Sequence, residues 1–201
     1  MPDGALIINH SPELDEILEK SAKLMARTGY HGASMRDLAR ATGRSLSGLY
    51  HYFRGKEDLL FLVNQRGFSS LLNMVDELEA AKLGPSETLR TLIRNHIGFF
   101  TRHLDEMRVI VFGTQDFSRE RRRIINDFKE RYRVRVQAIV GAYIVDQRGV
   151  PLGAVELTRK TFLLFGMMNW IFGWYSSGDH GPAEDLAEDI FRTFTKGCVE
   201  S

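Results

Sequence analysis

Residues 34–53 read SMRDLARATGRSLSGLYHYF, and this stretch decides the fold. Ser34 and Ser45 are each suited to cap a helix, because a serine hydroxyl can accept a hydrogen bond from a free backbone N–H of the first turn. Gly43 stands between the two segments and interrupts the first. Apolar residues recur at helical spacing after each serine: Met35, Leu38 and Ala39, then Leu46, Leu49 and Phe53. The pattern predicts two short helices joined by a tight turn.

The apolar side chains of the second segment are expected to point inward. The outward positions are then Ser45, Ser47, Gly48, His51 and Tyr52, with Tyr50 at the border. In a helix-turn-helix, the first helix braces the second, which presents such residues to the major groove of DNA. Small residues allow a close approach to base edges, and hydroxyl and ring donors suit phosphate oxygens. The arrangement predicts double-stranded DNA as a partner.

Positive charge is concentrated around the same stretch. The formal net charge of the 201-residue chain is only +1. Residues 27–56, however, contain one acid, Asp37, and six bases: Arg27, Arg36, Arg40, Arg44, Arg54 and Lys56. A compact basic segment beside a mildly acidic body is typical of a protein that binds DNA. Taken alone, the charge is explained equally well by a solvated basic helix face.

Helical signals extend along the whole chain. Apolar spacing, capping residues and glycine or proline breaks predict nine helices, at about residues 12–28, 34–42, 45–53, 56–81, 86–103, 105–112, 118–146, 153–176 and 182–198. The sequence contains no strand-type alternation of any length, so the predicted fold class is all-α.

Three segments in register resemble the TetR family of repressors. They are SMRDLARATG at 34–43, LYHYF at 49–53 and GKEDLL at 55–60. They follow an amphipathic helix, and the similarity extends over about residues 13–62. The resemblance implies a DNA-binding domain in residues 1–56, and a larger helical domain in residues 57–201 that binds a ligand and forms a homodimer.

The resemblance also implies roles for single residues. Ser34 matches a helix cap that touches phosphate, and Lys56 matches a phosphate-binding lysine. The start of the recognition helix corresponds to Ser45, Leu46, Ser47 and Gly48, and its cluster of phosphate and base contacts to Tyr50, His51 and Tyr52. Arg36 and Arg44 complete the candidate DNA-binding set. Two positions depart from the family pattern: Arg44 replaces an aliphatic residue of the turn, and Leu46 replaces a polar base reader and could contact a thymine methyl group.

Residues 161–175 form a run of fifteen residues without a formal charge. As a helix this run would span about 22 Å, too short for a membrane's hydrocarbon core of about 30 Å. A helix that is apolar on every side is buried on every side, so we expect a second subunit to cover the side that the core leaves free. The expected dimer face comprises Phe162, Phe165, Trp170, Phe172 and Phe191. The resemblance implies the same pairing, through helices 153–176 and 182–198; an internal core helix is the alternative.

Aromatic residues and a methionine of the body either form its core or line an effector cavity. The candidate lining residues are Phe99, Phe100, Phe112, Phe128, Met167, Trp170 and Trp174. Such a lining suits an apolar small molecule. Residues 163–170 with Trp174 and Tyr175 resemble regulators of fatty-acid and acyl-CoA metabolism, which implies an acyl-CoA effector. A basic run offers either an anionic-headgroup site or a solvated helix start: Arg119, Arg121, Arg122 and Arg123.

Other chemistry finds no support in the sequence. It holds no catalytic constellation, P-loop or dinucleotide-binding motif, and no cofactor is expected. His96 and His103 lack the cysteine or carboxylate cluster that would complete a metal site, so both are interpreted as surface or hydrogen-bonded histidines. The single cysteine, Cys198, and an N-terminus without a basic start or long apolar run predict a cytoplasmic protein.

These features predict a ligand-responsive transcriptional regulator, most simply a repressor. It is expected to bind a palindromic operator as a homodimer and to be released by an apolar small molecule, with a fatty acyl-CoA as the leading candidate. A small-molecule-sensing helical dimer without specific operator binding is the alternative, and a helical enzyme is a third class. The polar outer residues of 45–56 favour the regulator, and the lack of a nucleophile–base pair disfavours the enzyme.

Overall fold

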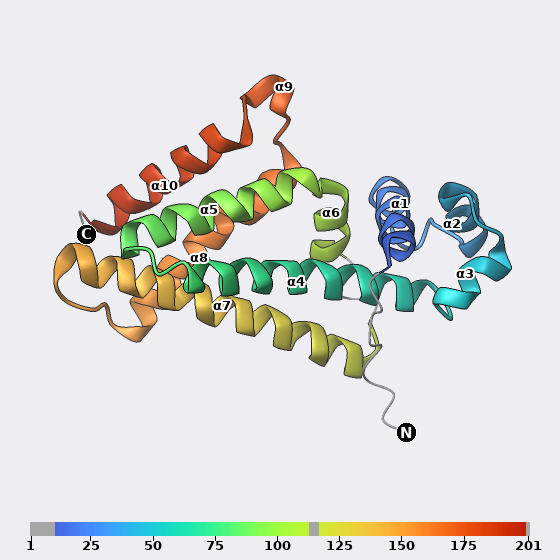
Figure 1. Ribbon diagram of the computed structural model, residues 1–201, viewed down its shortest axis with the longest axis horizontal. Helices are drawn as coiled ribbons and strands as arrows, with labels where there is room; N and C mark the ends of the chain where they lie inside the picture. Colours follow the sequence, from blue (N-terminus) through green and yellow to red (C-terminus); the bar gives the residue numbers. More distant parts are fainter. Residues whose placement is uncertain (1–10, 113–116, 200–201) are drawn as a thin grey trace. The chain divides into compact units, whose positions relative to one another are not determined.

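The computed structural model describes residues 11–112 and 117–199, and helices dominate these ranges (Figure 1). In chain order the elements are α1 (Pro12–Thr28), α2 (Met35–Thr42), α3 (Leu46–Tyr52), α4 (Lys56–Ala80), α5 (Pro85–Arg102), α6 (Leu104–Phe112), α7 (Arg119–Arg148), α8 (Ala154–Asn169), the 3-10 helix η2 (Trp170–Gly173), α9 (Ser177–His180) and α10 (Ala183–Val199). The described ranges contain no strand, and the predicted all-α class is confirmed.

The end of the uncharged run differs from the prediction. The helix expected to continue to residue 176 ends at Asn169, and η2 follows directly. Aromatic and β-branched residues and Gly173 have low helix propensity, and the neighbouring Ile171 and Phe172 of η2 are both buried. The loop expected at 177–181 contains the single helical turn α9.

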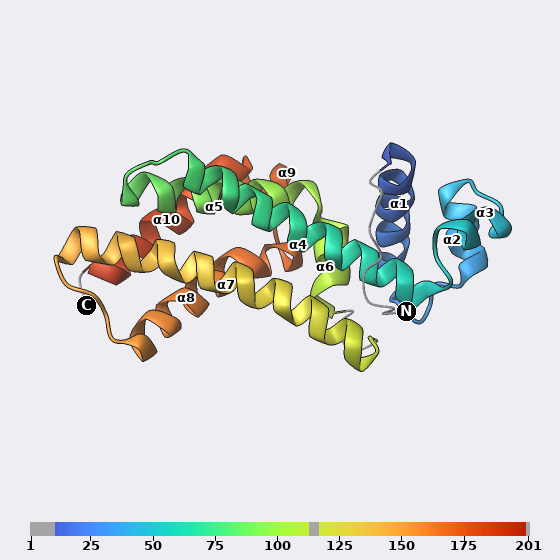
Figure 2. The same ribbon diagram turned by 60° about the horizontal axis from the view of Figure 1, so that its bottom comes forward.

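The chain forms two compact units that alternate along the sequence. One contains residues up to 69 together with 105–128, and the other contains 70–104 together with 129–201. The long helices α4 and α7, drawn in Figures 1 and 2, each contribute residues to both units. The functional boundary expected after residue 56 therefore lies inside the first unit and stays a prediction.

The first unit packs α1, α2 and α3 on a shared apolar centre and joins α4, α6 and α7 to it by ion pairs. Completely buried residues come from each of the first three helices: Leu18, Leu38 and Leu49. Arg66 of α4 lies 3.1 Å from a carboxylate oxygen of Asp15 in α1 and 2.7 Å from one of Glu106 in α6. Arg121 of α7 pairs with Asp58 at the start of α4.

The second unit is built on the packing of α5 against α10, which lie side by side in Figure 1. Leu89 and Ile93 of α5 are completely buried, and Ile190 and Phe194 of α10 are nearly so. Arg90 of α5 also contacts α10. It forms an ion pair with Glu188, and its guanidinium lies 4.1 Å from the ring centre of Phe191.

A buried polar cluster joins three helices inside the second unit. His96 of α5 lies 2.8 Å through Nδ1 from the hydroxyl of Tyr132 in α7, and 3.1 Å through Nε2 from Oδ1 of Asn169 in α8. The amide oxygen can only accept, so Nε2 carries the proton and Nδ1 accepts from the tyrosine. Burial lowers the pKa of His96 to about 4 and raises the pKa of Tyr132. His96 is therefore a neutral, hydrogen-bonded core residue.

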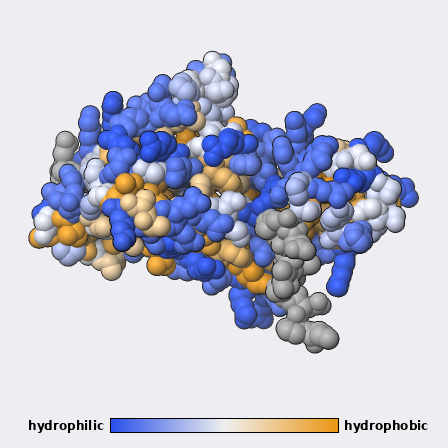
Figure 3. Space-filling model, in the orientation of Figure 1, coloured by the Kyte–Doolittle hydropathy of each residue, from blue (hydrophilic) through white to orange (hydrophobic). Residues whose placement is uncertain are grey.

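The surface differs between the parts of the chain. In the view of Figure 3, hydrophilic side chains prevail over the region of α1–α3, and apolar side chains reach the surface over the later helices. Among the residues that the structure describes, no helix has the length and apolarity needed to cross a membrane.

Candidate nucleic-acid interface

Helix α2 begins with a complete capping box. The Ser34 hydroxyl accepts a hydrogen bond from the backbone N–H of Asp37 at 3.2 Å, and the Asp37 carboxylate accepts one from the backbone N–H of Ser34, also at 3.2 Å. A hydrogen bond from Ser34 lowers the pKa of Asp37, so the carboxylate stays charged. The predicted capping role of Ser34 is confirmed, and its phosphate contact stays a prediction.

The turn between α2 and α3 depends on Gly43. Its backbone has φ 71° and ψ 21°, the left-handed conformation that favours glycine. The backbone N–H of Arg44 then donates to Ala39 at 3.0 Å, and the buried Thr42 hydroxyl donates to Leu38 at 2.8 Å. These bonds occupy the carbonyl groups of Leu38 and Ala39 in α2, and three residues separate the end of α2 from the start of α3.

Helix α3 has one buried and one exposed side, as predicted. Leu49 and the following Phe53 anchor it, with 0% and 3% exposure, and Leu46 is half-buried. Ser47, Tyr50 and His51 are exposed on the outer side, and Tyr52 is half-buried. Two exposed polar side chains and one exposed tyrosine on a firmly anchored helix form a surface suited to the major groove.

The cap of α3 explains two of the small residues at its start. The Ser45 hydroxyl accepts a hydrogen bond from the N–H of Gly48 at 3.0 Å. A Cβ atom at Gly48 would lie 3.2 Å from that hydroxyl, tighter than ordinary van der Waals contact. Gly48 therefore protects the cap as well as leaving space on the outer side.

Lys56, at the start of α4, is positioned by a residue that the sequence prediction did not include. Its ammonium group donates to the backbone oxygen of Tyr30 at 2.9 Å and lies 4.8 Å from the centre of the Tyr30 ring. An ammonium group has three donors, so this hydrogen bond leaves donors for a phosphate. No signal in the sequence connects Tyr30, in the turn after α1, with the start of α4.

Arg44, in the turn before α3, forms an ion pair with Glu13 in the first turn of α1. Arg44 Nη1 lies 2.5 Å from Oε1 of Glu13. A hydrogen bond with Glu13 raises the pKa of the Tyr52 hydroxyl. Arg44 thus pairs with a carboxylate where an aliphatic side chain would pack into the turn. The sequence analysis did not predict this contact.

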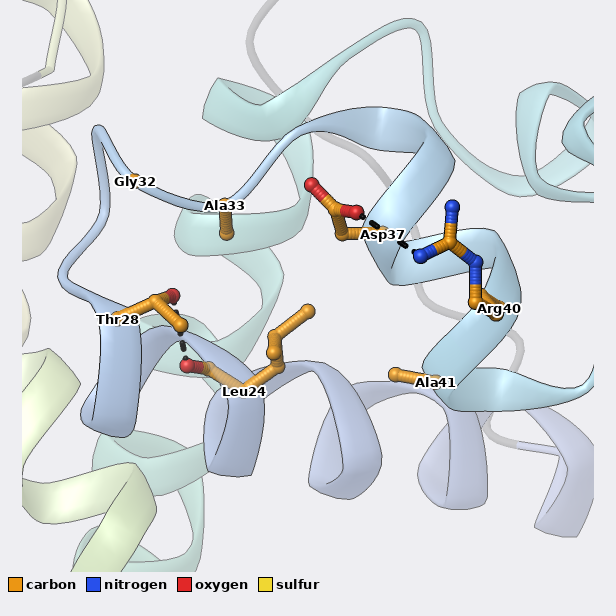
Figure 4. A pocket seen from close by; sticks show the side chains of 7 residues that line it. All are labelled: Leu24, Thr28, Gly32, Ala33, Asp37, Arg40 and Ala41. Carbon is orange, nitrogen blue, oxygen red and sulfur yellow. Dashed lines mark hydrogen bonds and ion pairs between the residues drawn. The ribbon is translucent and has the colours of Figure 1, made fainter.

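The remaining arginine of the candidate set, Arg36, is exposed on α2. Nearby, an open hollow of about 360 Å³ lies between α1 and α2 (Figure 4). Leu24, Ala33 and Ala41 supply much of its apolar wall, and Asp37 and Arg40 form an ion pair of 3.6 Å beside it. It lies apart from the outer residues of α3 and was not predicted.

The predicted cavity residues have different environments. Phe99 and Phe100 are buried on α5, and Phe128 and Met167 are half-buried. Trp170 and Trp174 are 59% and 46% exposed, which does not fit the interior lining expected of them. The reason is the early end of α8, after which the chain follows η2. Phe112 lies in α6, and its side chain is outside the described residues.

The residues of the predicted dimer face differ in their exposure. Phe162 and Trp170 are more than half exposed, as is the neighbouring Leu163, and Phe165 is half-buried. Phe172 and Phe191 are 3% and 6% exposed within the single subunit, so they are core residues and cannot offer a face to a partner. An uncharged run does not reveal which of its sides the subunit itself covers.

The basic start of α7 is only partly available to an anion. Arg121 is bound to Asp58 and lies 3.8 Å from Glu57, and Arg122 donates to the backbone oxygen of Phe117. Arg119 and Arg123 are exposed. Within residues 11–112 and 117–199, no group of three or more His, Cys, Asp or Glu side chains is placed to hold a metal ion.

Comparison with known families assigns both halves of the chain. Residues 17–63 match the model for bacterial regulatory proteins of the tetR family. Residues 82–198 match the model for the tetracyclin repressor-like C-terminal domain. The chain belongs to the TetR family. Its members are transcriptional regulators that bind DNA through a helix-turn-helix. In this chain α2 and α3 form that element.

Individual relatives resemble parts or all of this TetR-family chain. The HTH-type transcriptional repressor AcnR of Corynebacterium glutamicum is 36% identical over 62 residues, 31% of this chain and 33% of AcnR. The fatty acid metabolism regulator protein of Bacillus subtilis is 25% identical over 85 residues, 42% of this chain and 44% of that protein. The chain thus spans less than half the length of these curated relatives.

Similarity to a solved structure extends further. The crystal structure of AibR in complex with isovaleryl coenzyme A and operator DNA has a TM-score of 0.77 at 27% identity. The match covers 90% of this chain and 97% of AibR. The fold therefore continues through the C-terminal helices.

Proposed function

We propose that the protein is a repressor that binds a palindromic operator as a homodimer and is released by an acyl-CoA ester. The observation that carries the DNA-binding part is the arrangement of α3. Leu49 and Phe53 are buried and anchor this helix, and Ser47, Tyr50 and His51 are exposed on its outer side. In a helix-turn-helix protein these are the positions that reach base edges and phosphates.

A selection from random duplexes tests this proposal. We expect enrichment of a palindrome whose half-sites lie about one helical turn or somewhat more apart, because two α3 helices of a symmetric dimer read it. Ser47→Glu should weaken operator binding at least a hundredfold in fluorescence polarisation, since it adds a negative charge at the groove. Ser177→Glu, an exposed serine of α9, is the matched control. Enrichment of no palindrome would leave the sensing dimer without operator binding as the better description.

The homodimer is supported by the exposed apolar side chains Phe162, Leu163 and Trp170 of α8 and η2. Apolar groups of this size, clustered on one segment, favour a partner surface. Trp170→Glu should convert the dimer into a folded monomer in analytical ultracentrifugation, because the side chain is not needed in the core. Val150→Glu, another exposed apolar position but in a loop, should leave the dimer intact. A monomeric wild type at micromolar concentration would contradict the proposal.

The acyl-CoA effector is supported by the aromatic interior of the second unit and by the ligand of AibR. Phe100 stacks on His96 at 4.2 Å, and the rings of Tyr132 and Phe165 are 5.9 Å apart. A tenfold release of DNA needs only about 1.4 kcal/mol of preference for the released state. In polarisation assays, release should depend on acyl chain length and be absent with free coenzyme A. Unchanged DNA affinity and melting temperature across the series would contradict it.

A further inference from the structure

Glu13 forms an ion pair with Arg44 of the candidate DNA-binding set. It lies in the first turn of α1, which is fixed by Pro12 and by the Ser11 hydroxyl accepting from Leu14 N at 3.2 Å. From this position its carboxylate lies 2.5 Å from the Arg44 guanidinium. The Glu13–Arg44 pair therefore links the start of α1 to the turn immediately before α3.

The neighbouring acids make their direct contacts with other residues. Asp15 pairs with Arg66, and Glu16 lies 2.6 Å from Lys20. Asp37 belongs to the capping box of α2. Of these acids, Glu13 is the one that forms an ion pair with an arginine of the DNA-binding set.

The Glu13 carboxylate holds Arg44 immediately before the recognition helix. It also raises the pKa of the Tyr52 hydroxyl at the end of that helix. Without the carboxylate, the Arg44 guanidinium is free to pair with the phosphates of any DNA sequence.

We propose that Glu13 is a specificity-determining residue that restrains Arg44 and thereby suppresses binding to DNA of arbitrary sequence. The inference rests on the proposed DNA binding. A non-specific complex depends almost entirely on phosphate neutralisation, so each mobile base strengthens it. The operator complex also uses base contacts from Ser47 and His51, which need α3 held in one orientation. Removing the Glu13 carboxylate therefore strengthens the non-specific complex more than the operator complex.

The test compares Glu13→Gln with wild type on two duplexes, the selected palindrome and a random sequence of equal length. For the random duplex, we expect Glu13→Gln to steepen the salt dependence by about 0.9 in log–log slope, the value of one additional phosphate contact. Its affinity for that duplex should rise about threefold to tenfold at low salt, while operator affinity does not rise. The ratio of the two affinities should fall by a similar factor.

Two further variants isolate the pair itself. Glu19→Gln removes the same charge from an exposed position of α1, and should change the random-duplex slope much less. In an Arg44→Ala background, Glu13→Gln should have little further effect. Equal effects of the Glu13 and Glu19 variants, or an undiminished effect without Arg44, would overturn the proposal. Thermal melts by circular dichroism show whether each variant is folded.

Failure of the proposed function gives a different result. A wild type that binds the random duplex but selects no palindrome contradicts operator recognition, while the random-duplex arm still decides the role of Glu13. A folded wild type that binds neither duplex overturns both proposals.

Discussion

The helix-turn-helix and the buried polar cluster of the second unit are both built from hydrogen bonds, but over very different distances along the chain. Ser34 and Asp37 are three residues apart, as are Ser45 and Gly48. His96, in contrast, joins partners 36 and 73 residues away. The first arrangement follows from local sequence, whereas the second exists only after α5, α7 and α8 have packed.

This difference has an energetic consequence. An exposed cap that is lost can be replaced in part by water, because the freed N–H groups lie at a helix end. The groups around His96 have no such replacement, since the histidine is 1% exposed and an unpaired buried polar group keeps its full desolvation cost. We therefore expect substitutions in the cluster to cost several times as much as substitutions of the caps.

The largest expected effect is that of His96→Ala. It leaves the Tyr132 hydroxyl and the Asn169 amide without their buried partner and removes a ring stacked on Phe100. We expect a loss of about 4 kcal/mol in the free energy of unfolding, from a cavity and two weakened polar groups. Urea denaturation measures it. A loss no greater than that of His103→Ala, at the half-buried C-cap of the same helix, would show that the cluster contributes little.

The same histidine predicts a dependence of stability on pH. Its pKa is about 4 in the folded protein against 6.5 for the unperturbed group. Between these values the unfolded chain binds a proton that the folded chain does not, so the free energy of unfolding falls as pH decreases from 6.5 to 4. The total contribution is about 3 kcal/mol. Urea denaturation across this range should show a shallower fall in His96→Gln, whereas His31→Gln, at an exposed histidine, should follow the wild type.

The prediction from sequence succeeded where the determining contacts are local. Ser34, Gly43 and Ser45 set the bounds of α2 and α3 through bonds spanning three to five residues, and these elements were predicted within one residue. The exposed positions Ser47 and His51 followed from the apolar spacing of the same short helix.

The contacts of Glu13 with Arg44 and of Tyr30 with Lys56 were not predicted, because each joins residues of different helices or turns. Phe172 and Phe191 were assigned to the dimer face for a related reason. Apolar character indicates that a side chain is covered, but only the packed structure shows whether the same subunit covers it. The contact between Asn169, the last residue of α8, and His96 of another helix was not predicted for the same reason.

The smallest expected effect tests the local side of the comparison. Ser34→Ala removes the hydroxyl that accepts from Asp37 N and dissolves the capping box. We expect a loss of about 1 kcal/mol, and for Ser34→Gly only a few tenths, because glycine leaves the helix end open to water. Ser47→Ala, on the exposed side of α3, should change stability by less than about 0.5 kcal/mol. Thermal and urea denaturation of the three variants measure these changes in the free energy of unfolding. If Ser34→Ala cost as much as His96→Ala, the cap would be a cooperative part of the core, and the contrast between local and long-range bonds would fail.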